Sequence, residues 1–138
     1  RRASRPSVMV IGNSHFARVN AARLVPHAEV ILLPAFTIAE VHGKLSTLSS
    51  MPDCIIIHEI TNSVKYVPPH ISAQQLTTLV NEYAEKYPNT KFIISFGLPW
   101  LDSKELNFKV EMTNIMIKHY RLVLCLCRIY HFVITATS

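Results

Sequence analysis

The run Gly12 to His15 is the first group of residues whose types could do chemistry. It follows an apolar stretch, and Gly12 allows the chain to turn sharply there. A serine at the start of a helix lies among free backbone N–H groups, at the positive end of the helix dipole. That setting favours a nucleophilic hydroxyl at Ser14. It is equally typical of a helix N-cap, so the run alone leaves Ser14 with two interpretations.

Two further turns offer groups that could stabilise a developing negative charge. Asn62 comes shortly after the apolar run Cys54–His58, and its side-chain amide can donate a hydrogen bond to an oxyanion. The turn after the second apolar run supplies the backbone N–H of Ala35. If these turns meet Ser14 at one edge of the molecule, they form a site suited to attack on an acyl carbonyl.

Five short apolar runs predict the buried strands that would position these groups. Each run is rich in β-branched residues and is bounded by turn-forming residues. The runs are residues 8–11, 28–33, 54–58, 92–96 and 132–135.

Helical patterns separate the runs, at residues 16–24, 38–48, 72–87 and 105–130. Thr37 and Glu40 form a predicted capping box at the start of the second helix. Strands alternating with helices predict an α/β fold with a parallel sheet and helices on both faces. Ligands of such sheets bind at the carboxyl ends of the strands. We expect one domain over residues 8–138, preceded by a basic flexible segment, residues 1–7.

The three turns together resemble the first three conserved blocks of the SGNH (GDSL-type) hydrolases. Residues 12–14 stand where that family has Gly-Asp-Ser, Ala35 stands at the glycine of its second block, and residues 60–63 stand at its Gly-x-Asn-Asp. The resemblance covers essentially the full chain. It implies a three-layer α/β/α, flavodoxin-like fold with a five-stranded parallel sheet of order 2-1-3-4-5.

The resemblance also implies an ester hydrolase site. Ser14 would be the nucleophile, and the amides of Ser14 and Ala35 with the side chain of Asn62 would form the oxyanion hole. No metal or organic cofactor is needed. We expect four further residues to contact a small ester substrate: Asn13, His15, Phe36 and Trp100. Trp100 has the alternative interpretation of a loop anchor packed on the core.

The chain departs from the family pattern at several positions. Asn13 replaces an aspartate, and Ala35 and Ile60 replace glycines. The family's last block, Asp-x-x-His, supplies the base and its orienting carboxylate, but no aspartate follows Asp102 here. A serine without a base is a poor nucleophile. The chain is therefore either a truncated or diverged relative with weak or absent activity, or a binding module that no longer hydrolyses. His15 or His58 is an alternative base.

Charge favours a second hypothesis, a non-catalytic module that binds RNA or another nucleic acid. The formal net charge is +5, and SGNH-like domains occur in retroelement-encoded and Oskar-type proteins. The basic residues proposed for such an interface lie near the N-terminus: Arg1, Arg2, Arg5, Arg18 and Arg23.

The remaining expectations concern cellular context. Cys54, Cys125 and Cys127 lie in apolar runs without metal-site spacing, so we expect buried free thiols and no metal. No apolar run approaches the roughly 20 residues of a membrane helix, and no signal peptide is recognisable. These features predict an intracellular, cytoplasmic protein whose oligomeric state the sequence does not reveal.

Overall fold

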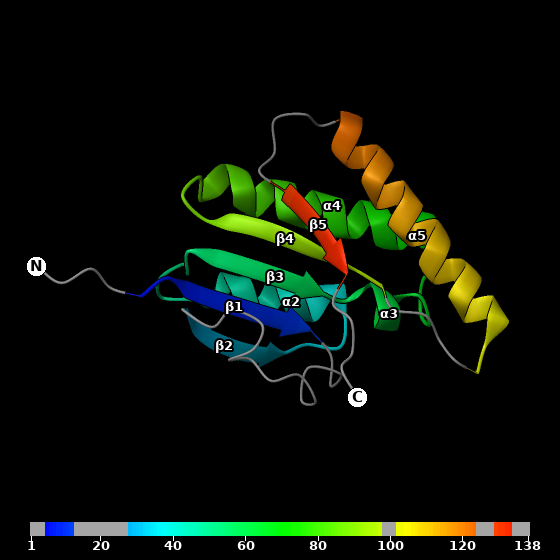
Figure 1. Ribbon diagram of the computed structural model, residues 1–138, viewed down its shortest axis with the longest axis horizontal. Helices are drawn as coiled ribbons and strands as arrows, with labels where there is room; N and C mark the ends of the chain where they lie inside the picture. Colours follow the sequence, from blue (N-terminus) through cyan, green and yellow to red (C-terminus); the bar gives the residue numbers. More distant parts are fainter. Residues whose placement is uncertain (1–4, 13–27, 98–101, 124–128, 134–138) are drawn as a thin grey trace, which may run out of the picture.

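The computed structural model describes residues 5–12, 28–97, 102–123 and 129–133. A five-stranded sheet forms its centre (Figure 1). The strands are β1 (Ser7–Gly12), β2 (Glu29–Pro34), β3 (Cys54–His58), β4 (Lys91–Phe96) and β5 (Ile129–Val133). All neighbours pair in parallel, in the order β2-β1-β3-β4-β5. The predicted sheet and strand order are confirmed.

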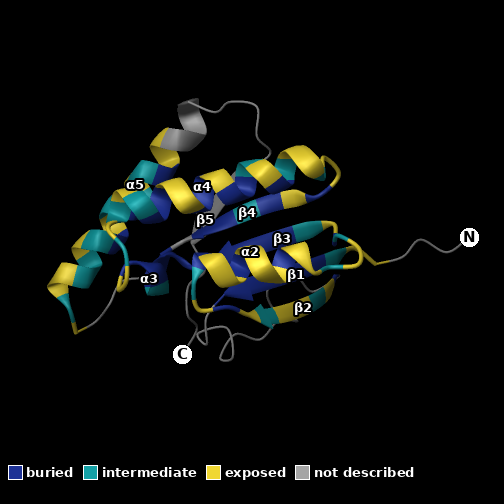
Figure 2. Ribbon diagram, turned by 180° about the vertical axis from the view of Figure 1, so that it is seen from behind, coloured by how far each residue is buried: buried dark blue, intermediate teal, exposed yellow. Residues whose placement is uncertain are grey.

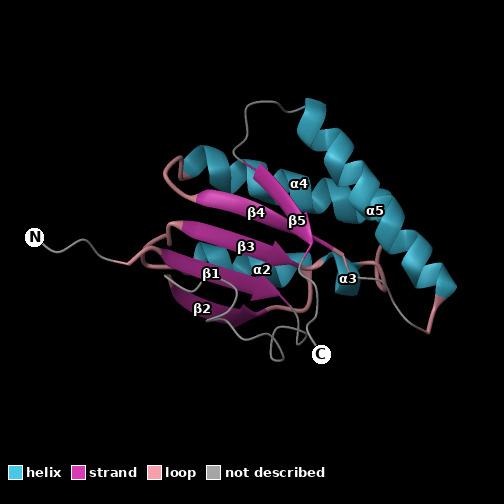
Figure 3. Cartoon of the chain, in the orientation of Figure 1, coloured by secondary structure: helices cyan, strands magenta, loops and turns pink. Residues whose placement is uncertain are grey.

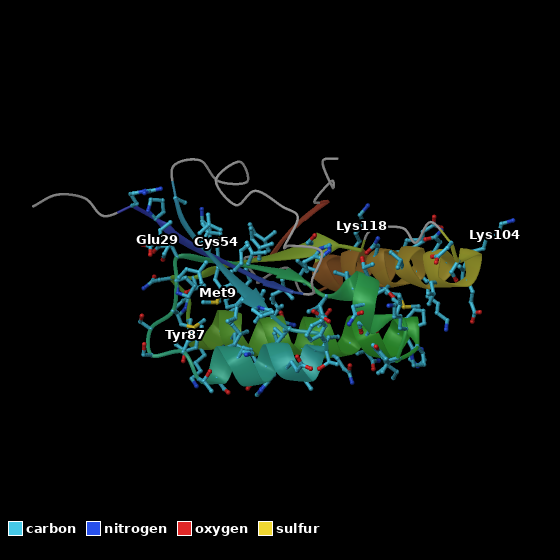
Figure 4. All side chains as sticks on the ribbon, turned by 90° about the horizontal axis from the view of Figure 1, so that it is seen from below. Met9, Glu29, Cys54, Tyr87, Lys104 and Lys118 are labelled. Carbon is cyan, nitrogen blue, oxygen red and sulfur yellow. The ribbon has the colours of Figure 1, made fainter. Side chains whose placement is uncertain are left out.

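One face of the sheet is covered by α2 (Ile38–Ser46) and α4 (Pro69–Lys86), which lie side by side in the view from behind (Figure 2). Alternate strand residues point toward these helices because successive side chains of a strand face opposite ways. Met9 lies between the sheet and the helices in Figure 4. Helix α5 (Lys104–Val123) packs along α4 and adds Val110 and Ile117 to the same core.

The other face carries a second, smaller apolar cluster. It consists of Val8, Val10, Ala28 and Ile56, all buried. The helix predicted at residues 16–24 would belong to this face, but it lies outside the described residues. Half-buried Cys54 borders the cluster as a free thiol, so it is less buried than expected. Cys125 and Cys127 lie outside the described residues.

Three helix and strand boundaries differ from the prediction by three residues or more. Figure 3 shows where the helices and strands lie. Helix α4 begins at Pro69, because proline at the first helical position removes no intrahelical hydrogen bond. Helix α5 ends at Val123, and not at residue 130, because Ile129 to Val133 pair with β4 as β5. The expected strand 132–135 therefore begins three residues earlier. A short helix, α3 (Ile60–Ser63), forms where a loop was expected.

The chain is already hydrogen-bonded before Val8. The Pro6 carbonyl accepts from Glu29 N–H at 2.9 Å, and Ser7 N–H donates to the Asp53 carboxylate at 2.8 Å. These residues, assigned above to the flexible segment, thus attach β1 to the starts of β2 and β3. None of the helices within the described ranges is both long and apolar enough to cross a membrane.

Candidate active site

The carboxyl ends of β1, β2 and β3 meet at one edge of the sheet. Gly12, the last residue of β1, lies opposite Pro34 on one side and His58 on the other. The Ala35 N–H donates to the Gly12 carbonyl at 2.7 Å, which extends the β1–β2 ladder by one bond. The edge that the sequence predicted for a ligand therefore exists, with β1 in its middle.

Asn62 connects this edge to the helices. It is the third residue of α3, and its side-chain Nδ2 donates to the backbone carbonyl of Phe36 in the turn after β2. The same turn is held by α2, because Phe36 N–H donates to Glu40 Oε2 at 3.0 Å and Glu40 N–H donates to Thr37 Oγ1 at 3.1 Å. The predicted N-cap at Thr37 is confirmed, whereas the Glu40 side chain accepts from the N–H of Phe36, one residue before the cap, and so holds the turn that Asn62 contacts.

Of the oxyanion donors predicted from the sequence, Asn62 has an N–H group left for a ligand, whereas Ala35 does not. The Ala35 amide is buried and already donates to Gly12, so it is not available to a ligand in this conformation. Asn62 has two side-chain N–H groups, and the bond to Phe36 uses one of them. Phe36, expected on the substrate side, is 51% exposed.

Most of the other predicted site residues lie outside the described residues. These are Arg1, Arg2, Asn13, Ser14, His15, Arg18, Arg23 and Trp100. Arg5 is described, and its guanidinium donates to the Ala28 carbonyl at 3.0 Å. Arg5 thus ties the start of β1 to the residue before β2.

His58 and Ser95 form a buried pair at the ends of β3 and β4. His58 Nδ1 lies 2.8 Å from Ser95 Oγ, and both side chains are buried. His58 lies two residues after Ile56 on β3, so it points to the face of the smaller apolar cluster, away from α2 and α4. Sequence reasoning named His58 but missed Ser95.

Glu59 is the functional candidate that sequence reasoning missed entirely. It follows β3 directly, is fully buried, and has no hydrogen-bond partner on either carboxyl oxygen within the described part of the chain. Burial raises the pKa of Glu59 to about 8; the nearby Asn62 amide lowers this pKa, and the Glu40 carboxylate raises it. The sequence did contain a signal for this residue. Glu59 stands two positions after Ile57, where the alternation of Ile55 and Ile57 places a charged residue on the buried face of the sheet.

A groove of about 710 Å³ starts beside this edge and runs between α2 and α4. Thr37 and Ser63 line its near part, and His42 and Glu82, 3.9 Å apart, also line it. Among the residues that the structure describes, no cluster of three or more His, Cys, Asp or Glu side chains could hold a metal ion.

The fold is that of the SGNH/GDSL hydrolases. A protein described as lipolytic, of the G-D-S-L family, from Desulfitobacterium hafniense superposes with a TM-score of 0.69 at 17% identity, over 91% of this chain and 76% of that one. A member of the same family from Veillonella parvula gives a TM-score of 0.66 at 14% identity, over 91% and 75%.

A psychrotrophic esterase, EstA from Pseudoalteromonas, gives a TM-score of 0.63 at 14% identity, over 91% and 76%. No family model and no curated protein sequence matches the chain. At these identities the similarity is one of fold alone.

Proposed function

We propose that this chain is an SGNH-type serine ester hydrolase domain with an incomplete catalytic triad, whose activity is weak but measurable. Ser14 is the proposed nucleophile, and Asn62 is the proposed side-chain donor to the oxyanion. The observation that carries the proposal is the convergence of the β1, β2 and β3 ends, with Asn62 hydrogen-bonded to the Phe36 turn at that edge.

In the proposed acyl transfer, Ser14 attacks the ester and Asn62 stabilises the negative charge that forms. Attack of the Ser14 hydroxyl on an ester carbonyl places negative charge on the carbonyl oxygen, and a donor about 3 Å from that oxygen lowers the barrier. The Ser14 proton needs a base; in the family's last block a histidine is that base and an aspartate orients it, and no such aspartate follows Asp102 within this sequence. Removing a triad member lowers the rate by orders of magnitude, which supports the expectation of weak activity.

Hydrolysis of p-nitrophenyl acetate tests the proposal. The purified protein should release p-nitrophenol above the buffer rate, and Ser14→Ala should abolish the release. Ser50→Ala is the matched control, because Ser50 is an exposed serine at the loop between α2 and β3. Activity that persists in Ser14→Ala would remove Ser14 from the mechanism.

The alternative is a non-catalytic module that binds nucleic acid, which the net charge of +5 favours. Its affinity for single-stranded RNA should fall steeply as salt rises, because lysine and arginine contacts to phosphates release counterions. The absence of binding at low salt would contradict this alternative, and binding without esterase activity would support it over hydrolysis.

A further inference from the structure

Glu59 is a fully buried carboxyl group that lacks hydrogen-bond partners among the described residues. Leaving a buried polar group unpaired costs about 1–3 kcal/mol. Apolar side chains fill the equivalent positions along β3, namely Ile55 and Ile57, so packing alone does not require a carboxyl group at Glu59. The group therefore calls for an explanation.

Two polar residues lie next to this carboxyl group. Glu59 is the N-cap of α3 and Asn62 is the third residue of that helix, so the two side chains are neighbours one turn apart. Glu40, from the first turn of α2, acts on Glu59 through its negative charge. Burial raises the pKa of Glu59 to about 8, so its carboxyl group is neutral at pH 7 and ionised in mildly alkaline solution.

The protonation state of Glu59 matters because Asn62 has one N–H group beyond the one that donates to Phe36. A carboxylate is a stronger hydrogen-bond acceptor than a neutral acid. An ionised Glu59 would therefore attract this second N–H, whereas a neutral Glu59 competes for it weakly.

We propose that Glu59 is a positioning residue for Asn62: its neutral form leaves the second Asn62 N–H to a ligand oxygen, and its ionised form draws that N–H away. The ligand oxygen would be an ester carbonyl that becomes an oxyanion, and this identification rests on the proposed function. The coupling between Glu59 and Asn62 does not depend on the proposed function.

The coupling is measurable without any substrate. The side-chain amide signals of Asn62 in ¹H–¹⁵N NMR, assigned by comparison with Asn62→Asp, should shift with pH around a midpoint near 8. In Glu59→Gln, which keeps the size but does not titrate, they should stay constant. Signals that do not titrate in the unsubstituted protein, or that titrate equally in Glu59→Gln, would overturn the proposal.

A second variant keeps the test decisive if Glu59→Gln does not fold. Glu40→Gln removes the charge that raises the Glu59 pKa but retains an oxygen to accept the Phe36 N–H. The Asn62 midpoint should move to lower pH in this variant. An unchanged midpoint would contradict the assignment of the titration to Glu59.

Ester hydrolysis then separates this inference from the proposed function. If both hold, kcat/KM falls about tenfold per pH unit above the midpoint, and this decline is absent in Glu59→Gln. Titration of Asn62 without hydrolysis at any pH overturns the proposed function and supports the coupling. Hydrolysis without Asn62 titration supports the function and overturns the coupling.

Discussion

Asn114 makes two hydrogen bonds to the backbone of Gly97. The Gly97 N–H donates to Asn114 Oδ1 at 2.9 Å, and Asn114 Nδ2 donates to the Gly97 carbonyl at 3.3 Å. One side chain from α5 thus satisfies both polar groups of the residue that follows β4. Because β4 pairs with β3, this contact holds the last strand end that borders the candidate active site.

Asn114→Ala should therefore destabilise the protein by about 1–3 kcal/mol, because the polar backbone groups of buried Gly97 lose their partner. Urea unfolding followed by circular dichroism measures the change. Ile115→Ala is the control on the next residue of α5, where the side chain is 59% exposed, and it should change the stability much less. Equal effects of the two substitutions would contradict the role of Asn114.

Two glycines give opposite predictions for replacement by alanine. A Cβ at Gly97 would lie 2.7 Å from both Ile60 Cγ2 and Val110 Cγ1, so Gly97→Ala should cost about 1–3 kcal/mol. A Cβ at Gly43, inside α2, meets nothing within 4 Å, so Gly43→Ala should stabilise the protein by about 0.5–1 kcal/mol. Thermal unfolding of the two variants measures both signs, and destabilisation by Gly43→Ala would refute the second.

The stability of the protein should depend on pH through Glu59. Between about pH 4.5 and about pH 8 the unfolded chain has lost the Glu59 proton, whereas the folded chain keeps it. The free energy of unfolding is therefore highest, as far as Glu59 is concerned, below pH 4.5. It falls by a few kcal/mol as the pH rises from about 4.5 to about 8, and it is constant above that range. Urea midpoints at pH 5, 7 and 9 should decline more in the unsubstituted protein than in Glu59→Gln; parallel declines would be evidence against a neutral Glu59.

The capping box of α2 should contribute measurably to stability. Thr37→Ala removes the acceptor of the Glu40 N–H and should cost about 1 kcal/mol, whereas Thr37→Ser retains a hydroxyl and should cost less. Thr47→Ala, at the C-cap of the same helix, serves as the control because its exposed hydroxyl bonds only to Lys44 within the described residues. Chemical unfolding that fails to separate Ala from Ser at position 37 would contradict the cap.

The sequence predicted four of the five strands well, because each is marked by a pattern of neighbouring residues. The runs at β1, β2, β3 and β4 are short, apolar and bounded by turn residues, and each strand lies within one or two residues of its prediction. The β5 boundary was wrong by three residues, because an apolar stripe at helical spacing continues past Val123 and only pairing with β4 decides where the strand begins.

By itself, the sequence determined the order of the five strands along the chain, the N-cap at Thr37, and the segments after β2 and β3 in which Ala35 and Asn62 lie. These depend on neighbours a few residues apart, whose periodicity and turn chemistry are readable along the chain. Only the tertiary structure decided that the Ala35 N–H binds Gly12, that Asn62 binds Phe36, and that Glu59 is buried with no hydrogen-bond partner among the described residues. The physical reason is that hydrogen-bond partners and exclusion from water arise from segments distant in sequence, which come together only when the sheet and helices pack.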